Sequence, residues 1–311
     1  MSRPTLPSVF RAQPPSHPRG RTLRRTGLAA ILLTAILGTI SVIAFDNARA
    51  VPIVRRTSIG MSTLGPGTTS IRVALLSDIH LGNSGMRPSR LERIIDQVNA
   101  EHPDLVLLAG DFIAGHDASA TQQAPGLSAP LARLKAPLGV IAVLGNHDYW
   151  TAPNAVRAAL EDGGVTVLEN EATRRGALTI VGVGDRFSGH DDLPHAFAAA
   201  QPLGGAPIVL THSPDLVPDL PATLQVVLAG HTHCGQAVLP WMGPLVQVAP
   251  LAHWRQLYNP HYRCGRIQDP GRLTIVTAGV GSGTIPLRLG AMPDWWLLTL
   301  QPLNVVTAAG K

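Results

Sequence analysis

Short apolar runs rich in Val, Ile and Leu recur along the chain and limit its fold more than any other feature of its 311 residues. Each run has the length and composition of a buried strand. Strands that alternate with helical patterns early and crowd together late predict a layered α/β or α+β sandwich in one domain, rather than an all-β barrel. The seven predicted strands are residues 71–76, 105–108, 140–144, 179–183, 208–210, 226–228 and 274–276.

Two helices are predicted between these strands. Residues 89–101 follow Pro88, and Ser89 and Glu92 have the spacing of a capping box, which predicts that the helix begins at Ser89. Residues 155–160 have the pattern of a second helix. Helices between strands are what a layered α/β architecture requires.

Two long segments are predicted as loops: residues 115–130, which are small and polar, and residues 234–271. Long ordered loops in a compact domain are often functional, so the second is a candidate cover for a site. It contains the aromatic residues Trp241, Trp254, Tyr258 and Tyr262. These residues fit a small core of the loop as well as they fit a lipid-binding surface.

An uncharged and mostly apolar run covers residues 26–45 and is long enough to cross a bilayer as a helix. Six Arg and no acidic residue precede it, so the positive-inside rule places residues 1–25 in the cytoplasm and the following domain outside. Residues 1–25 contain five Pro and are predicted to be a disordered basic tail. Residues 46–70 are predicted to be a linker to a domain of residues 71–311.

The N-terminal segment also has features of an export signal. Arg24 and Arg25 resemble the twin-arginine signal, although the residues that follow match that pattern only loosely. Ala48-Arg49-Ala50 fits a small-x-small cleavage site. Two alternatives therefore stay open: a membrane anchor with an extracytoplasmic domain, or export followed by cleavage near Ala50.

The positive charge of the chain is concentrated at its N-terminus. Residues 1–50 hold seven of the 25 basic residues and one of the 20 acidic residues. The remainder therefore carries 18 basic and 19 acidic side chains, a net charge near −1. A near-neutral domain argues against a surface that binds the phosphate backbone of nucleic acids.

Cys234 and Cys264 are the two cysteines of the chain and permit one disulfide at most. Their pairing is possible in an oxidising compartment. Cys234 directly follows a candidate metal ligand, but adjacent residues of a strand point to opposite sides. Packing or a disulfide with Cys264 is therefore favoured over a place in the metal shell.

Polar residues of the metal-ligand type directly follow five of the predicted strands. The carboxyl ends of strands are where ligand sites form in open α/β sheets, so these residues are expected to converge. Mixed Asp, Asn and His ligands suit first-row divalent metals, and two ions can share a bridging carboxylate. The candidates are Asp78 and His80, then Asp111, then Asn146 with His147 and Asp148, then His212, and finally His231 with His233.

Two pairs of these candidates are separated by a single residue. Asp78 and His80 form one pair, and His231 and His233 form the other. In an extended segment, residues two apart lie on the same side of the backbone. Each pair is therefore expected to direct both side chains toward one cation.

The ordered motifs resemble the calcineurin-like metallophosphoesterase superfamily, in its bacterial membrane-associated or exported branch. This resemblance implies a four-layered αββα sandwich and a dinuclear-metal phosphoric ester hydrolase that uses a metal-activated hydroxide. The residues that carry it are Asp78-x-His80, Gly110-Asp111, Gly145-Asn146-His147-Asp148, Thr211-His212 and Gly230-His231-Thr232-His233. The similarity extends through Gly281-Ser282-Gly283 and Pro286-Leu287-Arg288.

The resemblance also implies a role for each residue of the site. The first of two divalent ions, Mn, Fe or Zn, would be held by Asp78, His80, Asp111 and His233. The second would be held by Asp111, Asn146, His212 and His231. His147 would protonate the leaving-group oxygen, and Asn146 would help to stabilise charge on the phosphoryl oxygens.

One position departs from the family pattern. Some members carry an Asp three residues after the bridging Asp, which orients the catalytic His, and here that position is Ala114. Asp148 or a substrate phosphate would then orient His147, although Asp148 fits a helix-start residue equally well. The remaining histidines have no motif and are predicted to be solvated loop residues: His116, His190, His195, His253 and His261.

Three functions are consistent with these motifs. The leading hypothesis is hydrolysis of a phosphomonoester, phosphodiester or pyrophosphate, with a lipid-linked or cell-envelope phosphate as one candidate substrate. A nuclease would use the same metal chemistry, but the near-neutral domain argues against it. A catalytically inactive metal-binding protein is the third, and the complete ligand set argues against it.

Overall fold

The computed structural model describes residues 19–249 and 255–303, with side chains from residue 25 onward. It divides into two compact units, residues 1–42 and 43–311. The first contains most of the helix α1 (Arg19–Arg49), in which residues 25–49 are long and apolar enough to cross a membrane. Residues 19–25, predicted to be disordered, belong to this helix, and residues 1–18 lie outside the described part of the chain.

The segment predicted as a linker is structured over much of its length. The last turns of α1 belong to the second unit, where Ala44 and Ala48 are buried. Residues 53–61 form the strand β1 (Ile53–Met61), so the linker prediction is wrong for them. The polar residues of β1 hid the strand in the sequence, because its pairing with a distant strand, not its own apolar content, stabilises it.

The first sheet has six strands in the order β1-β16-β2-β3-β4-β5. β1 runs parallel to β16, β16 runs antiparallel to β2, and β2 to β5 are parallel to one another. Three of the predicted strands lie here. The bounds are β2 Ile71–Leu76, β3 Leu105–Ala109, β4 Val140–Val143, β5 Thr166–Val167 and β16 Asp294–Pro302.

The second sheet also has six strands, in the order β14-β15-β9-β8-β7-β6. Its four central strands are parallel, and the two edge strands are antiparallel to their neighbours. It contains the other four predicted strands. The bounds are β6 Glu171–Arg175, β7 Leu178–Gly182, β8 Ala206–Leu210, β9 Val226–Ala229, β14 Gly265–Asp269 and β15 Arg272–Val276.

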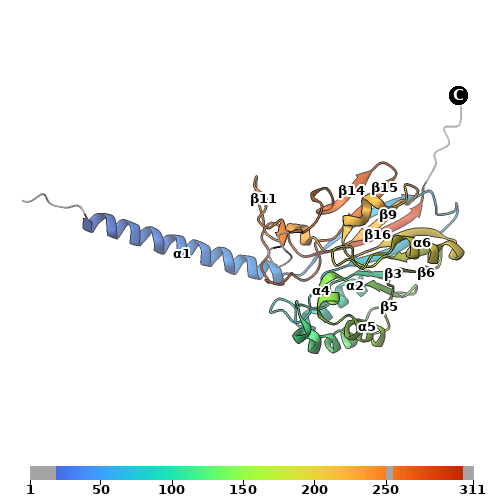
Figure 1. Ribbon diagram of the computed structural model, residues 1–311, viewed down its shortest axis with the longest axis horizontal. Coiled ribbons are helices and arrows are strands. Elements are labelled where there is room, and N and C mark those ends of the chain that lie inside the picture. Colours follow the sequence, from blue (N-terminus) through green and yellow to red (C-terminus); the bar gives the residue numbers. More distant parts are fainter. Residues whose placement is uncertain (1–18, 250–254, 304–311) are drawn as a thin grey trace, which may run out of the picture. The chain divides into compact units, whose positions relative to one another are not determined.

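Helices cover the outer faces of both sheets, which confirms the αββα sandwich (Figure 1). In β2, Ala74 and Leu76 pack against the helices of the first sheet, whereas Val73 and Leu75 pack against the second sheet. The alternation follows from the period of two in a strand. The helices are α2 Pro88–Ala100, α3 Ser128–Leu131 and α5 Pro153–Asp162 over the first sheet, and α6 Leu193–Ala200 over the second.

The predicted capping box at the start of α2 is absent. Pro88 occupies the first helical position, and Arg87 is the N-cap, without a side-chain cap hydrogen bond. Ser89 therefore lies inside the first turn, where its hydroxyl cannot act as the cap. Proline is favoured at this position because its missing N–H has no partner in the helix.

Both predicted loops contain secondary structure. Residues 118–127 form the 3-10 helix η1 (Ala118–Leu127), capped by Asp117. In the second, Tyr258 and Tyr262 are buried, Trp241 is fully exposed, and Trp254 lies outside the described residues. Besides β14, it contains the short elements η4 His233–Gly235, β10 Val238–Leu239, β11 Gly243–Pro244, β12 Val248–Ala249, β13 Arg255–Gln256 and η6 Pro260–Tyr262.

Candidate metal centre

The candidate ligands converge where the central strands of the two sheets end. Each is buried or nearly buried, although its residue type is usually exposed. From the first sheet come Asp78 and His80 after β2, Asp111 after β3, and Asn146 at the start of α4 (Asn146–Thr151) after β4. From the second come His212 after β8, and His231 with His233 after β9.

The two Asp-x-His and His-x-His pairs do not lie in extended backbone, contrary to the expectation. Asp78 and His80 have φ angles of 53° and 50°, and His231 and His233 have φ angles of 70° and 48°. In this left-handed conformation both side chains still reach the site, and the intervening Ile79 turns into the hydrophobic core. Non-glycine residues in this region are uncommon and concentrate at functional sites.

One group of donor atoms surrounds the carboxylate of Asp111. His80 Nε2 lies 3.4 Å from Asp111 Oδ2 and 3.2 Å from His233 Nε2. Asp78 Oδ1 lies 3.5 Å from the same nitrogen of His233. These four residues are those that the resemblance implies for the first ion.

A second group lies on the other side of the same carboxylate oxygen. His212 Nε2 is 3.3 Å from Asp111 Oδ2 and 3.1 Å from Asn146 Oδ1. His231 Nδ1 is 3.3 Å from His212 Nε2. Asp111 Oδ2 is thus shared by both groups, as a bridging ligand must be.

The spacing of these donor atoms fits divalent cations. Ligands bound at about 2.0 to 2.2 Å lie roughly 3 to 3.5 Å apart around one ion, which is the spacing of both groups. Among the described residues, Asp78 Oδ1 is buried without a hydrogen-bond partner, although its Oδ2 accepts from the N–H of His231 at 3.1 Å. A buried carboxylate oxygen without a partner is costly, and a cation would satisfy it.

The tautomers of two histidines are set by backbone carbonyls. His212 Nδ1 lies 2.7 Å from the carbonyl oxygen of Ala109, to which it donates, so Nε2 is left free to bind a metal. His231 Nε2 lies 2.8 Å from the carbonyl oxygen of Leu257, so Nδ1 is left free. Hydrogen bonds of this kind orient imidazole ligands and raise their basicity.

Burial dominates the electrostatics of the site. Burial, reinforced by the charge of Asp111, raises the pKa of Asp78 to about 7, and burial lowers the pKa of His80 to about 3. Burial opposes charge on Asp111 and His212 too, but their mutual attraction holds the pKa of Asp111 well below its usual value and that of His212 well above. A bound cation favours the deprotonated form of each group, because metal ligands compete with protons.

Glycines allow the ligand-bearing turns to come together. Gly110 has φ +79°, and a Cβ there would lie 2.7 Å from the backbone nitrogen of Gly145. A Cβ on Gly230 would lie 2.5 Å from the side chain of Ser77, next to Asp78. Neither position accepts a side chain without moving a ligand.

Asp148 stabilises the backbone around the site and does not orient His147. Its two carboxylate oxygens accept hydrogen bonds from four backbone N–H groups, at 2.8 to 3.3 Å. One of these donors is the N–H of Gly145, the N-cap of α4. Asp148 is therefore a helix-start residue, which is the alternative role that the sequence analysis gave it. The donors are the N–H groups of Asp111, Phe112, Ile113 and Gly145.

His147 is oriented by a backbone carbonyl instead. Its Nδ1 lies 2.5 Å from the carbonyl oxygen of Gly115, the residue after the Ala114 that breaks the family pattern. Its backbone N–H donates to Asp111 Oδ1 at 2.9 Å, which ties the histidine to the carboxylate that both donor groups share. One ring nitrogen of His147 also lies within 4.8 Å of donor atoms of His80 and Asp111.

Sequence reasoning missed three residues at this site. His116 is exposed, as predicted, but its ring lies 4.6 Å from that of His147 and its Nε2 lies 2.6 Å from the hydroxyl of Thr284. Asp185 is fully buried after β7. Burial lowers the pKa of His231, and the charge of Asp185 opposes this shift; behind Asp111 and Asp78, it also contributes to the raised pKa of His212. The position of Asp185 shortly after β7 is the sequence feature that could have identified it. His253 lies outside the described residues.

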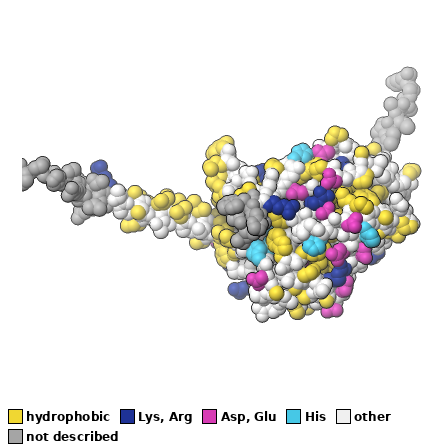
Figure 2. Space-filling view, viewed as in Figure 1, with side chains coloured by type: hydrophobic (Ala, Val, Ile, Leu, Met, Phe, Trp, Pro, Cys, Tyr) yellow, Lys and Arg dark blue, Asp and Glu magenta, His cyan; other side chains and the backbone are white. Residues whose placement is uncertain are grey.

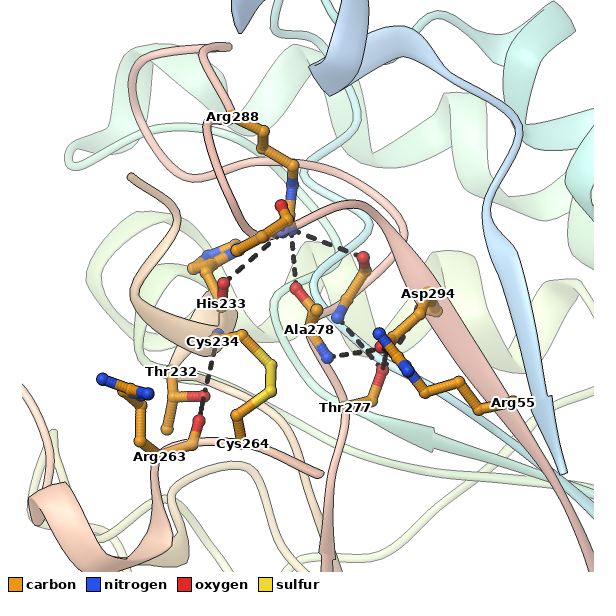
Figure 3. The surroundings of a disulfide bond; sticks show 12 residues. Arg55, Thr232, His233, Cys234, Arg263, Cys264, Thr277, Ala278, Arg288 and Asp294 are labelled. Atoms are coloured by element: carbon orange, nitrogen blue, oxygen red, sulfur yellow. Dashed lines mark hydrogen bonds and ion pairs between the residues drawn. A yellow bond between two sulfur atoms is a disulfide. The ribbon is translucent and has the colours of Figure 1, made fainter. Parts of the chain in front are cut away.

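The third missed residue is Arg288. The sequence analysis identified the motif Pro286-Leu287-Arg288 but predicted no role for it. Its guanidinium is fully buried and donates to the carbonyl oxygens of Ala278 and Gly281 at 2.6 and 2.7 Å. It also lies 3.1 Å from His233 Nδ1 (Figure 3). Arg288 therefore holds the 278–281 segment against His233.

Cys234 and Cys264 form a disulfide, one of the two roles that the sequence favoured for Cys234 (Figure 3). Their Cα atoms are 4.7 Å apart, within the usual range. The hydroxyl of Thr232 donates to the carbonyl oxygen of Arg263 at 2.6 Å beside it. The disulfide thus fixes the 255–264 segment, which includes the carbonyl that orients His231, to the ligand motif.

Two mixed sheets with a shared carboxylate between two donor groups define a metal-dependent hydrolase of the dinuclear class. The sequence of residues 71–235 matches the calcineurin-like phosphoesterases, and the chain belongs to this family. It is 31% identical over 242 residues to an uncharacterised metallophosphoesterase of Aquifex aeolicus, covering 76% of this chain and 87% of the relative.

A second relative covers more of the chain, and one solved structure is weakly similar to it. A transmembrane protein with metallophosphoesterase domain from Bos taurus is 29% identical over 303 residues, covering 89% of this chain and 64% of the relative. A solved 5'-nucleotidase precursor from Thermus thermophilus is 17% identical, with a TM-score of 0.44, and covers 74% of this chain and 55% of that chain. The chain spans 48% to 64% of the length of three animal relatives.

Proposed function

We propose that the chain hydrolyses a phosphoester with two divalent cations, each held by one of the donor groups described above. The first group is Asp78, His80, Asp111 and His233, and the second is Asp111, Asn146, His212 and His231. The observation that carries this proposal is the sharing of Asp111 Oδ2 by both groups at 3.3 and 3.4 Å. When bound, such cations supply an activated water and offset the charge of the phosphoryl oxygens.

The residues around the ions have separate tasks in this proposal. Asn146 Oδ1 faces His212, and its amide N–H₂ group can donate to a phosphoryl oxygen. His147 donates through Nδ1 to Gly115, so Nε2 is the nitrogen that can hand a proton to the leaving oxygen. The Gly115 carbonyl takes the orienting role that an Asp has in other members of the family.

The substrate we propose is a phosphomonoester, phosphodiester or pyrophosphate at the cell envelope, with lipid-linked phosphates included. The metal is Mn, Fe or Zn, since mixed Asp, Asn and His ligands suit all three. The alternative of a nuclease is disfavoured by the near-neutral charge of residues 51–311. Activity of metal-depleted protein reloaded with each ion, measured on a panel of esters, distinguishes these possibilities.

For localisation, we propose that α1 anchors the domain in a membrane, with the N-terminus in the cytoplasm and the domain outside. Removal by cleavage near Ala50 is the alternative. Arg90 donates to the carbonyl oxygens of Arg49 and Ala50 at 3.2 and 2.9 Å, and Ala48 is buried. These contacts favour retention of the helix, because cleavage would remove residues that pack in the folded domain.

The acid role of His147 gives the sharpest test of the function. General-acid assistance contributes about 10² to 10⁴ in rate, and it matters most when the leaving oxygen is basic. His147→Ala should therefore reduce hydrolysis of an alkyl phosphoester far more than hydrolysis of a nitrophenyl ester, with two ions still bound. The control is His195→Ala, an exposed histidine on α6.

Three results would contradict parts of this proposal. Equal losses on the two esters would exclude the acid role of His147. Loss of metal from His147→Ala would make this residue a ligand instead. A wild-type protein that binds two ions but hydrolyses no ester of the panel would support the inactive metal-binding alternative.

A further inference from the structure

Most of the exposed large apolar side chains of the second unit fall in three segments of the chain. Within its described residues, large hydrophobic side chains with high exposure occur directly after α1, on the hairpin formed by β10 and β11, and at Ile285. The exposed residues of these three segments are Val51 and Ile53, then Trp241, Met242, Leu245 and Val246, and finally Ile285. The other exposed large hydrophobics in the described part of this unit are Ile43 on α1, Trp150, Val248 and Leu303.

The hairpin carries the most exposed of these residues. Trp241 and Met242 lie at its tip with exposed fractions of 102% and 72%, between the paired residues Leu239 and Gly243. Trp241 has a φ of 64°, which is costly for a bulky residue. Figures 1 and 2 show the hairpin, labelled at β11, as an apolar projection from the surface. No described residue of the domain covers this tip.

Hydrogen bonds connect the hairpin to the last turns of α1. Arg288 and Leu289 form the link: the N–H of Arg288 donates to the carbonyl oxygen of Ala44 at 2.8 Å. On the other side, the N–H of Val238 donates to the carbonyl oxygen of Leu289 at 2.7 Å. Within the second unit, residues 288–289 therefore connect the start of the hairpin to the end of α1 through backbone hydrogen bonds.

The same surface borders the metal centre. Gln236, at the base of the hairpin, donates to the carbonyl oxygen of Ile285 at 3.0 Å and accepts from the N–H of Gly283 at 2.9 Å. Thr284, which lies between Gly283 and Ile285, contacts His116 through its hydroxyl, and the ring of His116 lies against that of His147. A continuous path therefore runs from the apolar hairpin through the 283–285 segment to the catalytic histidine.

We propose that this hairpin inserts Trp241 and Met242 into the lipid surface of the membrane that α1 spans, and so presents the metal centre to phosphoesters in that membrane. The proposal rests on the anchor and the phosphoesterase activity proposed above. A lipid surface fits better than a protein partner because Trp favours the membrane interface. Val51 and Ile53, which are also exposed, follow the end of α1 directly, where the helix would leave the bilayer.

Leu303 provides a matched control. It is exposed to 53%, and its N–H donates to the carbonyl oxygen of Met61, the last residue of β1. β1 begins at Ile53, next to the end of α1, so Leu303 lies roughly 25 Å from that end at 3.3 Å per strand residue. The substitution Leu303→Asp therefore measures the effect of a new surface charge that lies away from the proposed lipid contact.

The first experiment measures lipid contact without any catalysis. The full chain is reconstituted in vesicles of phosphatidylcholine and phosphatidylglycerol, with bromine near the glycerol end of the acyl chains as a fluorescence quencher. Trp241→Phe should lower the quenched part of the tryptophan emission, whereas Trp150→Phe should leave it unchanged. Equal quenching in wild type and Trp241→Phe would overturn the proposal, and a protein not retained in the vesicles would overturn the anchor.

The second experiment compares two substrates of the same chemistry: a nitrophenyl phosphodiester with a long acyl chain that enters the vesicles, and its short-chain soluble analogue. Trp241→Asp should slow hydrolysis of the membrane-bound ester about tenfold or more and spare the soluble one. Leu303→Asp should slow neither. Equal losses on both esters in Trp241→Asp would overturn the proposal, whereas no hydrolysis by the wild type would overturn the proposed function and leave the quenching result standing.

Discussion

Replacing Asp148 by Asn separates its two proposed roles. The carboxylate accepts from four backbone N–H groups: one oxygen serves Asp111 and Gly145, and the other serves Phe112 and Ile113. A carboxamide keeps one oxygen but replaces the other by an N–H₂ group, which cannot accept. Two buried N–H groups therefore lose their partner.

The size of the effect follows from this count. A buried donor left unsatisfied costs about 1 to 3 kcal/mol, so Asp148→Asn should lower the free energy of unfolding by about 2 to 6 kcal/mol. Whole domains are stable by only about 5 to 15 kcal/mol. The loss should therefore be visible as a large shift in the unfolding midpoint.

Urea unfolding of the full chain in detergent, followed by tryptophan fluorescence, measures this shift. The control is Asp117→Asn, since Asp117 is exposed, bonds to Ser119 at the start of η1, and Asn caps helices equally well. Its change should stay below about 1 kcal/mol. An Asp148→Asn protein with wild-type stability but a much lower rate on alkyl esters would refute the stabilising role of Asp148. That result would support the role of orienting His147 instead.

Three other predictions follow from the site and the anchor. His80→Ala and His231→Ala should each remove metal and activity together, and two ions still bound in both variants would contradict the ligand assignment. Reduction of the disulfide between Cys234 and Cys264, which are 30 residues apart, should lower the unfolding free energy by about 3 to 4 kcal/mol, and a midpoint insensitive to reductant would argue against it. A reporter fused after Lys311 should be extracytoplasmic, and reporter activity in the cytoplasm would reverse the topology.

The sequence analysis predicted seven of the eight central strands of the two six-stranded sheets, because those seven are buried on both faces, and it missed β16. A run such as Ile71–Leu76 is apolar throughout most of its length and needs no knowledge of its partners. Strands at the sheet edges were missed for the opposite reason. β6, with the sequence EATRR, is stabilised by pairing with β7 and by solvation of its polar side chains, neither of which is visible in a local pattern.

The same contrast holds at the metal centre. The candidate ligands were recognisable because each follows a buried strand. The left-handed backbone at five of them was not, since it depends on contacts between distant turns. Asp148 shows the limit best. Its type and position suit an orienting residue, yet its partners are set by the N–H groups that β3 happens to present after residue 110.

The position of β16 sets the order in which this domain can be assembled. β16 is the last strand among the described residues, yet it lies between β1 and β2, the first two of them. Until residues 294–302 have emerged from the ribosome, β1 has no neighbour in the first sheet and β2 has one open edge. Folding of this sheet therefore cannot be completed before β16 is available, and a chain truncated before Asp294 would expose two unpaired strand edges to aggregation.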